Sequence, residues 1–240
     1  ALALEFLERD AQELVDDYWI GLADRPALEA ALAARHRADA VVRRTLAGMT
    51  IDERTMGSWS LPGGHLRAMG AAREAGAPII AANAPRRYVR HLREAGPEGF
   101  ERLTPEQRRL VEDPGELTGG RYRDAFMGLM EGMAGHGAAE RVDARAFYFA
   151  QNIWDATMAD SVIDALDRGH RPVILIVGQF HSDDNGGVLQ RIAEARPAAS
   201  ISTVSYQPVF SPTLRQEDRT RAGAVVYTAP PSGDGDALME

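Results

Sequence analysis

The feature that most constrains the fold of this 240-residue chain is a run of five apolar residues, Val173 to Val177, which ends at the segment Gly-Gln-Phe-His, residues 178–181. A short apolar run bounded by turn residues is typical of a strand buried within a parallel sheet. Open α/β sheets bind their ligands just beyond the carboxyl ends of their strands. We therefore expect His181 to lie at a site on the rim of a sheet.

Strands and helices alternate along the chain, which predicts an α/β fold with a mostly parallel central sheet flanked by helices. The expected strands cover residues 1–7, 79–83, 173–177, 200–205 and 224–228, and the expected helices cover residues 10–20, 26–56, 65–74, 143–168 and 186–195, with a further helix starting at 105. We expect one domain over residues 1–230, with a helical, Met- and Gly-rich insertion at about residues 100–142 and a flexible tail at 231–240.

Three of these helices begin with capping residues. Asp10 is followed three residues later by Glu13, and Thr104 is followed by Gln107, so both starts have the pattern of a capping box. Asp143 stands directly before the long helix, where its side chain can accept hydrogen bonds from free backbone N–H groups.

Composition excludes several classes of function. The formal net charge is −8 and no basic stripe is present, which argues against nucleic-acid binding. Cysteine is absent, which removes disulfides, thiolate metal sites and cysteine nucleophiles. All 27 basic residues are arginine, so Schiff-base lysines and Walker-type phosphate loops are also excluded. No apolar run approaches the ~20 residues that span a bilayer.

Polar residues fall at the same end of the expected strands, namely Glu5, Asn83, Arg86, His181 and Tyr206. If the strands are parallel, these side chains emerge on one rim. Gln151 and Asp155 are four residues apart, so they share one face of the long helix. Carboxylates, a histidine and an arginine on one rim suit acid–base chemistry, metal binding or carboxylate recognition.

Each of these residues also has a plainer interpretation. His181 could cap a neighbouring loop, Gln151 and Asp155 could tie a loop to the helix, and Arg86 could brace its own turn. The turn at residues 183–186 could bind a cation, although an ordinary turn is the simpler reading. We expect the remaining histidines that stand among polar residues to face solvent: His36, His65, His91 and His170.

Four segments resemble, in order, landmarks of one family. They are Leu4-Glu5-Phe6-Leu7-Glu8-Arg9-Asp10, Ala81-Ala82-Asn83-Ala84-Pro85-Arg86, Ala150-Gln151 with Trp154-Asp155-Ala156-Thr157-Met158-Ala159, and Gly178-Gln179-Phe180-His181. On these residues the sequence resembles the ChaN-like family of bacterial haem-binding, iron-regulated lipoproteins. That family is similar in fold to a wider group with the Tiki proteases, TraB-like proteins and erythromycin esterases. The resemblance implies a haem-binding homodimer for iron or haem uptake, periplasmic or membrane-associated, while the composition suits the cytosol equally.

The sequence departs from the family pattern at one place. Members normally begin with a strand that ends in Gly-Glu-x-His, upstream of the position matching Leu4, and this sequence contains no such motif. The chain opens directly on a strand at Ala1, so we expect further residues upstream. The motif either lies there or is lacking in this member.

A haem site requires an apolar slot, an iron ligand and cations for the propionates. By the resemblance, candidate ligands are His136, with Met133, Met130 and Met127 at three-residue steps before it, and the tyrosines Tyr122, Tyr148 and Tyr206. Further candidates to contact the cofactor are Arg86, Gln151 and His181. The Met/His set would also suit copper, and the methionines could simply be packing residues, as Tyr148 could be.

Three classes of function remain open. The favoured one is a non-catalytic haem-binding protein. The second is a metal-dependent hydrolase, in which Glu5, Asp155 and His181 hold a divalent metal or activate water, with His136 as another possible metal ligand. The third is a domain with a degenerate site that is kept for interaction with another chain.

Overall fold

The structure is a computed structural model that describes residues 1–46, 60–134 and 143–228. Its strands are β1 (Leu2–Glu8), β2 (Ile79–Asn83), β3 (Ile174–Ile176), β4 (Val204–Gln207) and β5 (Ala224–Tyr227). Its helices are α1 (Gln12–Ile20), α2 (Arg25–Leu46), α3 (Gly63–Glu74), α4 (Arg86–Ala95), α5 (Pro105–Arg108), α6 (Gly120–Ala134), α7 (Ala144–Asp167), α8 (Gln179–Ser182) and α9 (Gly187–Ala195). Short 3-10 turns are η1 (Arg9–Ala11), η2 (Pro97–Arg102) and η3 (Gln216–Asp218).

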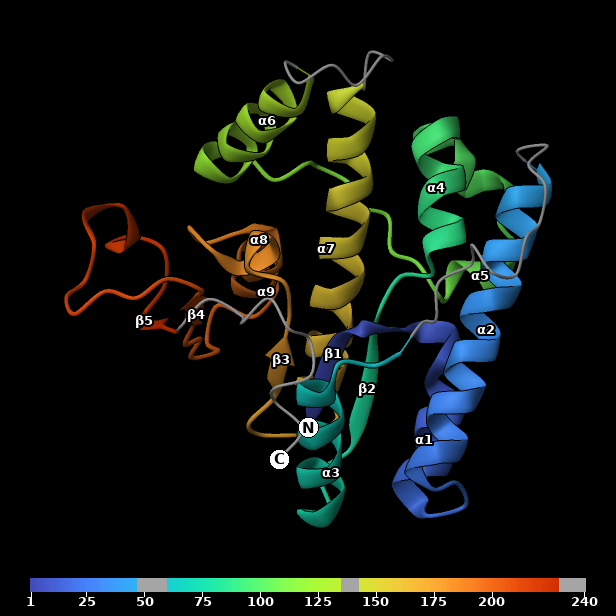
Figure 1. The fold of residues 1–240 in the computed structure, drawn as a ribbon. Helices are drawn as coiled ribbons and strands as arrows, with labels where there is room; N and C mark the ends of the chain where they lie inside the picture. Colours follow the sequence, from blue (N-terminus) through green and yellow to red (C-terminus); the bar gives the residue numbers. More distant parts are fainter. Residues whose placement is uncertain (47–59, 135–142, 229–240) are drawn as a thin grey trace.

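The predicted α/β fold with a parallel sheet is confirmed. β1 lies between β2 and β3 and runs parallel to both (Figure 1). β4 and β5 form a separate parallel pair rather than extending this sheet. The expectation that residues 173–177 form a fully buried strand is wrong. Only Ile174–Ile176 are extended, and Ile174 is 56% exposed, because β3 pairs with β1 alone among the described residues.

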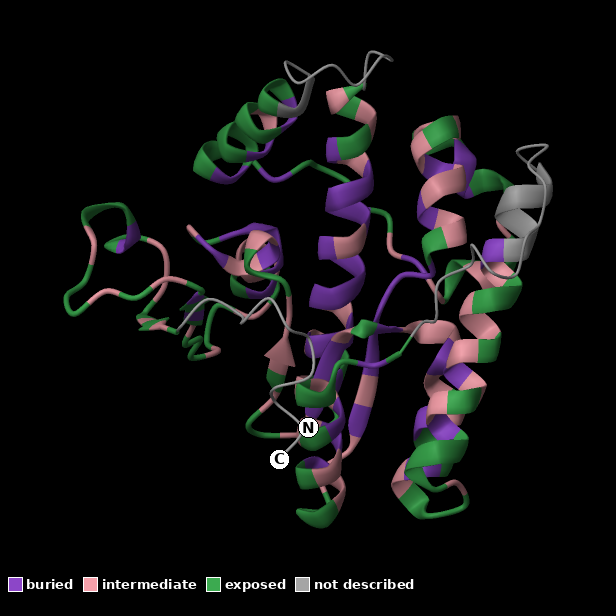
Figure 2. Ribbon diagram, viewed as in Figure 1, coloured by how far each residue is buried: buried purple, intermediate pink, exposed green. Residues whose placement is uncertain are grey.

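Helices cover both faces of the three-stranded sheet. Leu2 and Leu4 of β1 pack against α1, α2 and α3, whereas the intervening Ala3 belongs to a second cluster with α7 and α9. This division follows from the alternation of side chains along a strand. The small side chains of Ala3 and Ala82 bring the sheet close to Met158 and Ala159 of α7, which is buried along most of its length (Figure 2).

Most helix boundaries agree with the expected ones, but α4, which directly follows Pro85, and the short helix α8 were not anticipated. The expected helical, Met- and Gly-rich insertion contains α6. The caps at Thr104 and Asp143 are confirmed. The capping box at Asp10 is wrong, because its carboxylate instead forms ion pairs with Arg35 of α2 and Arg87 of α4. Within the described ranges, no helix is both long and apolar enough to cross a membrane.

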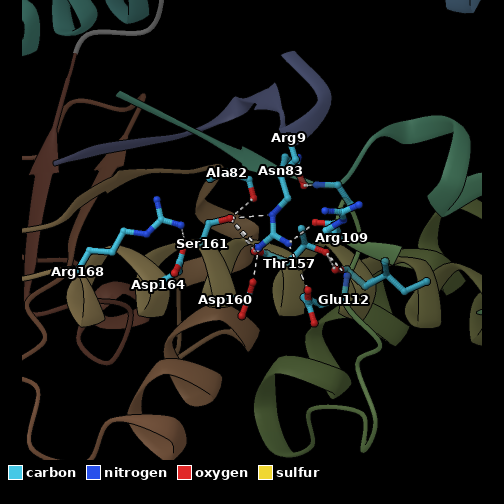
Figure 3. Close-up of polar contacts among 12 residues, drawn as sticks. Arg9, Ala82, Asn83, Arg109, Glu112, Thr157, Asp160, Ser161, Asp164 and Arg168 are labelled. Carbon is cyan, nitrogen blue, oxygen red and sulfur yellow. Dashed lines mark hydrogen bonds and ion pairs between the residues drawn. The ribbon is translucent and has the colours of Figure 1, made fainter. Parts of the chain in front are cut away.

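Arg9 joins the end of β1 to α7 (Figure 3). Its guanidinium donates to the Thr157 carbonyl at 2.8 Å, to Ser161 Oγ at 2.9 Å and to Asp160 Oδ2 at 2.6 Å. It also pairs with Glu112 at 3.3 Å, and only 13% of its side chain is exposed. The carboxyl end of β1 is therefore fixed against the middle of α7.

Replacing Arg9 with methionine is expected to destabilise the fold by about 3 kcal/mol, because the buried carbonyl and hydroxyl acceptors lose their donor. Urea unfolding followed by circular dichroism measures this. The control is Arg168→Met, whose ion pair with Asp164 is exposed, so its cost should stay below about 1 kcal/mol. Equal effects of the two changes would contradict the assigned role of Arg9.

Candidate functional site

A groove of about 810 Å³ lies between α2, α4 and α7, over the carboxyl ends of β1 and β2. Its apolar lining includes Leu32, Val89, Phe147 and Trp154. Four of the five rim residues expected from the sequence line it: Glu5, Asn83, Arg86 and His181. They converge because parallel strands present their carboxyl ends at the same edge, and Asn83 Nδ2 donates to the Glu5 carbonyl across the strands at 3.1 Å.

One end of the groove contains a buried polar network around His181. Its Nδ1 lies 2.6 Å from Asp155 Oδ1, and the other oxygen of Asp155 accepts from the Tyr122 hydroxyl at 2.6 Å. Gln151 Nε2 donates to the Tyr122 oxygen at 3.0 Å. On the groove side, His181 Nε2 is 3.6 Å from Glu5 Oε1. Asp155, Gln151, Tyr122 and His181 are all buried, so the network is shielded from bulk water.

Two glycines allow this network to form. Gly178, just after β3, donates its N–H to Glu5 Oε2 and so fixes the Glu5 carboxylate. Gly187, the first residue of α9, lies so close to Asp155 that a Cβ there would be 2.6 Å from Asp155 Cγ. Glycine is needed at Gly187 because α9 approaches α7 at the carboxylate.

The charges around His181 favour its protonated form. Burial lowers the pKa of His181, but the hydrogen bond to Asp155 and the negative charges of Asp155 and Glu5 outweigh burial. The pKa of His181 is therefore raised above the ordinary value for histidine. The same network raises the pKa of Tyr122, through burial first and then through the Asp155 charge, so Tyr122 remains a neutral hydrogen-bond donor.

The walls of the groove carry more positive than negative charge. Five arginines line it, namely Arg35, Arg86, Arg87, Arg90 and Arg93, against three carboxylates, namely Glu5, Glu8 and Asp39. Arg35 and Arg87 are both paired with Asp10, and Arg93 stacks on Phe147 with its guanidinium carbon 4.4 Å from the ring centroid. This groove is therefore suited to an anionic ligand although the chain has a net charge of −8.

Two arginines of the groove have guanidinium groups open to a ligand. Arg86 and Arg90 are four residues apart on α4, so they share one helix face. Arg86 is only loosely paired, with Nε 3.8 Å from Glu8 Oε1, and its side chain is 60% exposed. In the described part of the chain, Arg90 has neither a hydrogen bond nor an ion pair.

Other candidates from the sequence lie elsewhere. Met130 is buried beside Phe126 and Tyr148 in the cluster between α6 and α7, which does not line the groove, and Tyr206 is 63% exposed on β4. His136 lies outside the described residues, as does the side chain of Met133. Tyr122 contributes to the network rather than to the groove lining.

A metal centre built on Glu5, Asp155 and His181 would have few ligands available. Both oxygens of Asp155 are occupied by His181 and Tyr122, so Asp155 orients the imidazole and leaves only Glu5 and His181 facing the groove. Across the ranges that the structure describes, no group of three or more His, Asp or Glu side chains is arranged to hold a metal ion.

The four histidines expected to face solvent are all partly exposed and partly buried: His36, His65, His91 and His170. His36 lines the groove, and the ring of His65 lies 4.8 Å from that of Phe6. The segment at residues 183–186 is an ordinary turn, in which Asp183 pairs with Arg221 at 2.8 Å and the Asp184 N–H donates to the Arg221 carbonyl.

Sequence reasoning missed half of the groove. The wall formed by α2, with Arg35 and His36, comes from a helix that carries no local signal of a site. Arg90 and Trp154 could have been found from helical spacing, because Arg90 lies four residues after Arg86 and Trp154 lies three residues after Gln151.

Comparison with known proteins gives the family. The family model described as haem-binding uptake, Tiki superfamily, ChaN matches residues 1–192, which is most of the chain. The chain belongs to the ChaN family. The matched residues include β1, β2, β3, α6, α7 and α8, and therefore every member of the network around His181.

The fold of this ChaN-family chain is also found in a solved structure. The structure described as cofacial haem binding to ChaN of Campylobacter jejuni matches with a TM-score of 0.51 and 14% sequence identity, over 93% of this chain and 71% of that chain. At this identity the likeness concerns the fold alone. A comparison with curated protein sequences found no match.

Proposed function

We propose that this chain binds haem in the groove between α2, α4 and α7, as a non-catalytic protein for uptake or handling of haem. The observation that carries the proposal is the pairing of apolar walls with Arg86 and Arg90, which have guanidinium groups open to a ligand, in one groove of about 810 Å³. Haem is a flat apolar macrocycle with two carboxylates, and ligand pockets of about 300–1,000 Å³ with a few placed charges suit such molecules. Membership of a haem-binding family supports the same ligand.

The residues of the groove divide between the two parts of haem. Phe147, Trp154 and Val89 provide apolar contact for the macrocycle. Arg86 and Arg90 bind the propionates, since a guanidinium donates two parallel hydrogen bonds to a carboxylate. When bound, haem would supply an iron centre, and the network around His181 would lie at one end of the groove that holds it.

We further propose that the haem-loaded protein is a homodimer. The solved structure of ChaN from Campylobacter jejuni is described as binding haem cofacially, an arrangement in which two haems face one another. A groove that leaves one face of a flat ligand uncovered gains from a second copy that buries it.

A periplasmic or membrane-associated location remains a prediction from the resemblance.

A haemin titration of the purified chain tests the proposal. We expect a saturable Soret band at one haem per chain, and a shift from monomer to dimer by size-exclusion chromatography as saturation is reached. Absence of a saturable band would refute haem binding. If elemental analysis of the same preparation then showed bound metal that His181→Ala lost, hydrolysis through Glu5 and His181 would become the better interpretation.

A further inference from the structure

Three consecutive charged residues at the end of β1 contact the three helices that enclose the groove. Glu8 accepts a hydrogen bond at 3.2 Å from the first backbone N–H of α4, and Arg9 donates to a backbone carbonyl of α7 at 2.8 Å. Asp10 forms ion pairs with Arg35 of α2 and Arg87 of α4. The residues that follow β1 therefore determine where the walls of the groove lie.

Asp10 joins two walls that belong to different parts of the core. α2 packs in one apolar cluster with α1 and α3, whereas α4 packs in another with α7 (Figure 1). Among the described residues, no apolar cluster contains side chains of both α2 and α4. A single carboxylate oxygen, Asp10 Oδ2, is paired with both Arg35 and Arg87, and the Asp10 side chain is only 8% exposed. Without this carboxylate, the two guanidinium groups would lose the anion that they share.

Asp10 also determines which arginines of the groove can bind a ligand. Arg35 and Arg87 line the groove, but Asp10 balances their charge from behind, since it does not line the groove itself. Of the arginines that the structure describes in the groove wall, Arg86 and Arg90 have guanidinium groups open to a ligand. Two open guanidinium groups match the two propionates of haem.

We propose that Asp10 is a specificity-determining residue, which holds α2 to α4 and restricts the groove to porphyrins with two carboxylates. The inference rests on the proposed function and adds the class of porphyrin that the groove selects. If Asp10 lost its charge, Arg35 and Arg87 would be free to bind anions in the groove that they line. Four open arginines would then favour a porphyrin with four carboxylates.

Two iron-free porphyrins that differ in their number of carboxylates test this selection. Protoporphyrin IX has two propionates and coproporphyrin III has four, and fluorescence titration gives the affinity for each. The wild-type protein should prefer protoporphyrin IX. In Asp10→Asn, which keeps the shape of the side chain, the ratio of the two affinities should shift at least about 10-fold toward coproporphyrin III. A wild-type preference for coproporphyrin III, or an unchanged ratio in Asp10→Asn, would overturn the inference, because loosened packing alone weakens both porphyrins alike.

Removing the released cations should reverse this shift. A triple variant that combines Asp10→Asn with Arg35→Gln and Arg87→Gln should return the ratio to within about twofold of the wild-type value. If it kept the preference for coproporphyrin III, the released arginines would not be the cause and the inference would fail. The control for Asp10→Asn is Asp164→Asn, which removes an exposed carboxylate that pairs with Arg168 away from the groove lining and should leave the ratio unchanged.

Failure of this inference and failure of the proposed function give different results. A wild-type protein that binds neither porphyrin refutes the proposed function, and the selection by Asp10 with it. A wild-type protein that binds protoporphyrin IX, together with an Asp10→Asn variant of unchanged ratio, refutes only the role of Asp10.

Discussion

Replacing Gly187 with alanine is expected to weaken haemin binding at least about 10-fold and to lower the melting temperature by several degrees. The new Cβ would lie 2.6 Å from Asp155 Cγ, closer still to its Oδ2, and 3.0 Å from a ring carbon of Tyr122. Asp155 is in the middle of α7 and fully buried, so its carboxylate must rotate away from His181 and Tyr122. Overpacking of this kind costs about 1–3 kcal/mol.

The matched control for this prediction is Gly70→Ala. Gly70 lies within α3, where an added Cβ meets nothing within 4 Å, so alanine should stabilise the helix by about 0.5–1 kcal/mol and leave haemin affinity unchanged. Thermal unfolding by calorimetry and haemin titration measure both effects. A Gly187→Ala protein with wild-type melting temperature and haemin affinity would show that Asp155 does not support the site.

Reversing the charge of Arg86 and Arg90 together is expected to reduce affinity at least about 100-fold for both haemin and protoporphyrin IX. Each arginine would lose a charged hydrogen bond worth about 1.5–3 kcal/mol, and about 1.4 kcal/mol corresponds to a factor of ten. The introduced glutamates would also repel the propionates. Because Arg90 has no other partner in the described ranges and Arg86 only a loose one, the fold should tolerate the change.

A control with the same change in net charge separates local from overall electrostatics. Arg67 and Arg102 are exposed and do not line the groove, so Arg67→Glu with Arg102→Glu should leave both affinities within about twofold at physiological salt. Competitive fluorescence titration with protoporphyrin IX gives both affinities. If the two double variants lost equal affinity for the porphyrins, the propionates would not bind at α4.

The elements with a clear periodic pattern were predictable from the sequence, and those without one were not. β1, β2 and α7 have strong apolar patterns and lie where they were expected. α4 buries Val89 and Leu92 and presents arginines elsewhere, which is a clear but short amphipathic pattern, and its start directly after Pro85 makes the segment resemble a turn. Residues 173–177 looked like a central strand because apolar composition does not distinguish a central strand from an edge strand.

The part of the candidate site that lies at the ends of the parallel strands was predictable from the sequence. Glu5, Asn83 and His181 converge because their strands are parallel, which sequence alternation implies. The bond between Tyr122 and Asp155 joins helices α6 and α7, and no spacing along the chain announces such a contact. Met130 is buried by helix packing beside Phe126 and Tyr148, which agrees with the alternative that the methionines are packing residues, while its role toward a ligand stays a prediction.

The most direct test of haem binding in the groove is the position of iron in crystals of the haem-loaded chain, located by anomalous scattering at the iron absorption edge. We expect a single iron peak per chain in the groove between α4 and α7, with the propionates at Arg86 and Arg90. An iron peak at α6, or on the surface away from these residues, would contradict the account.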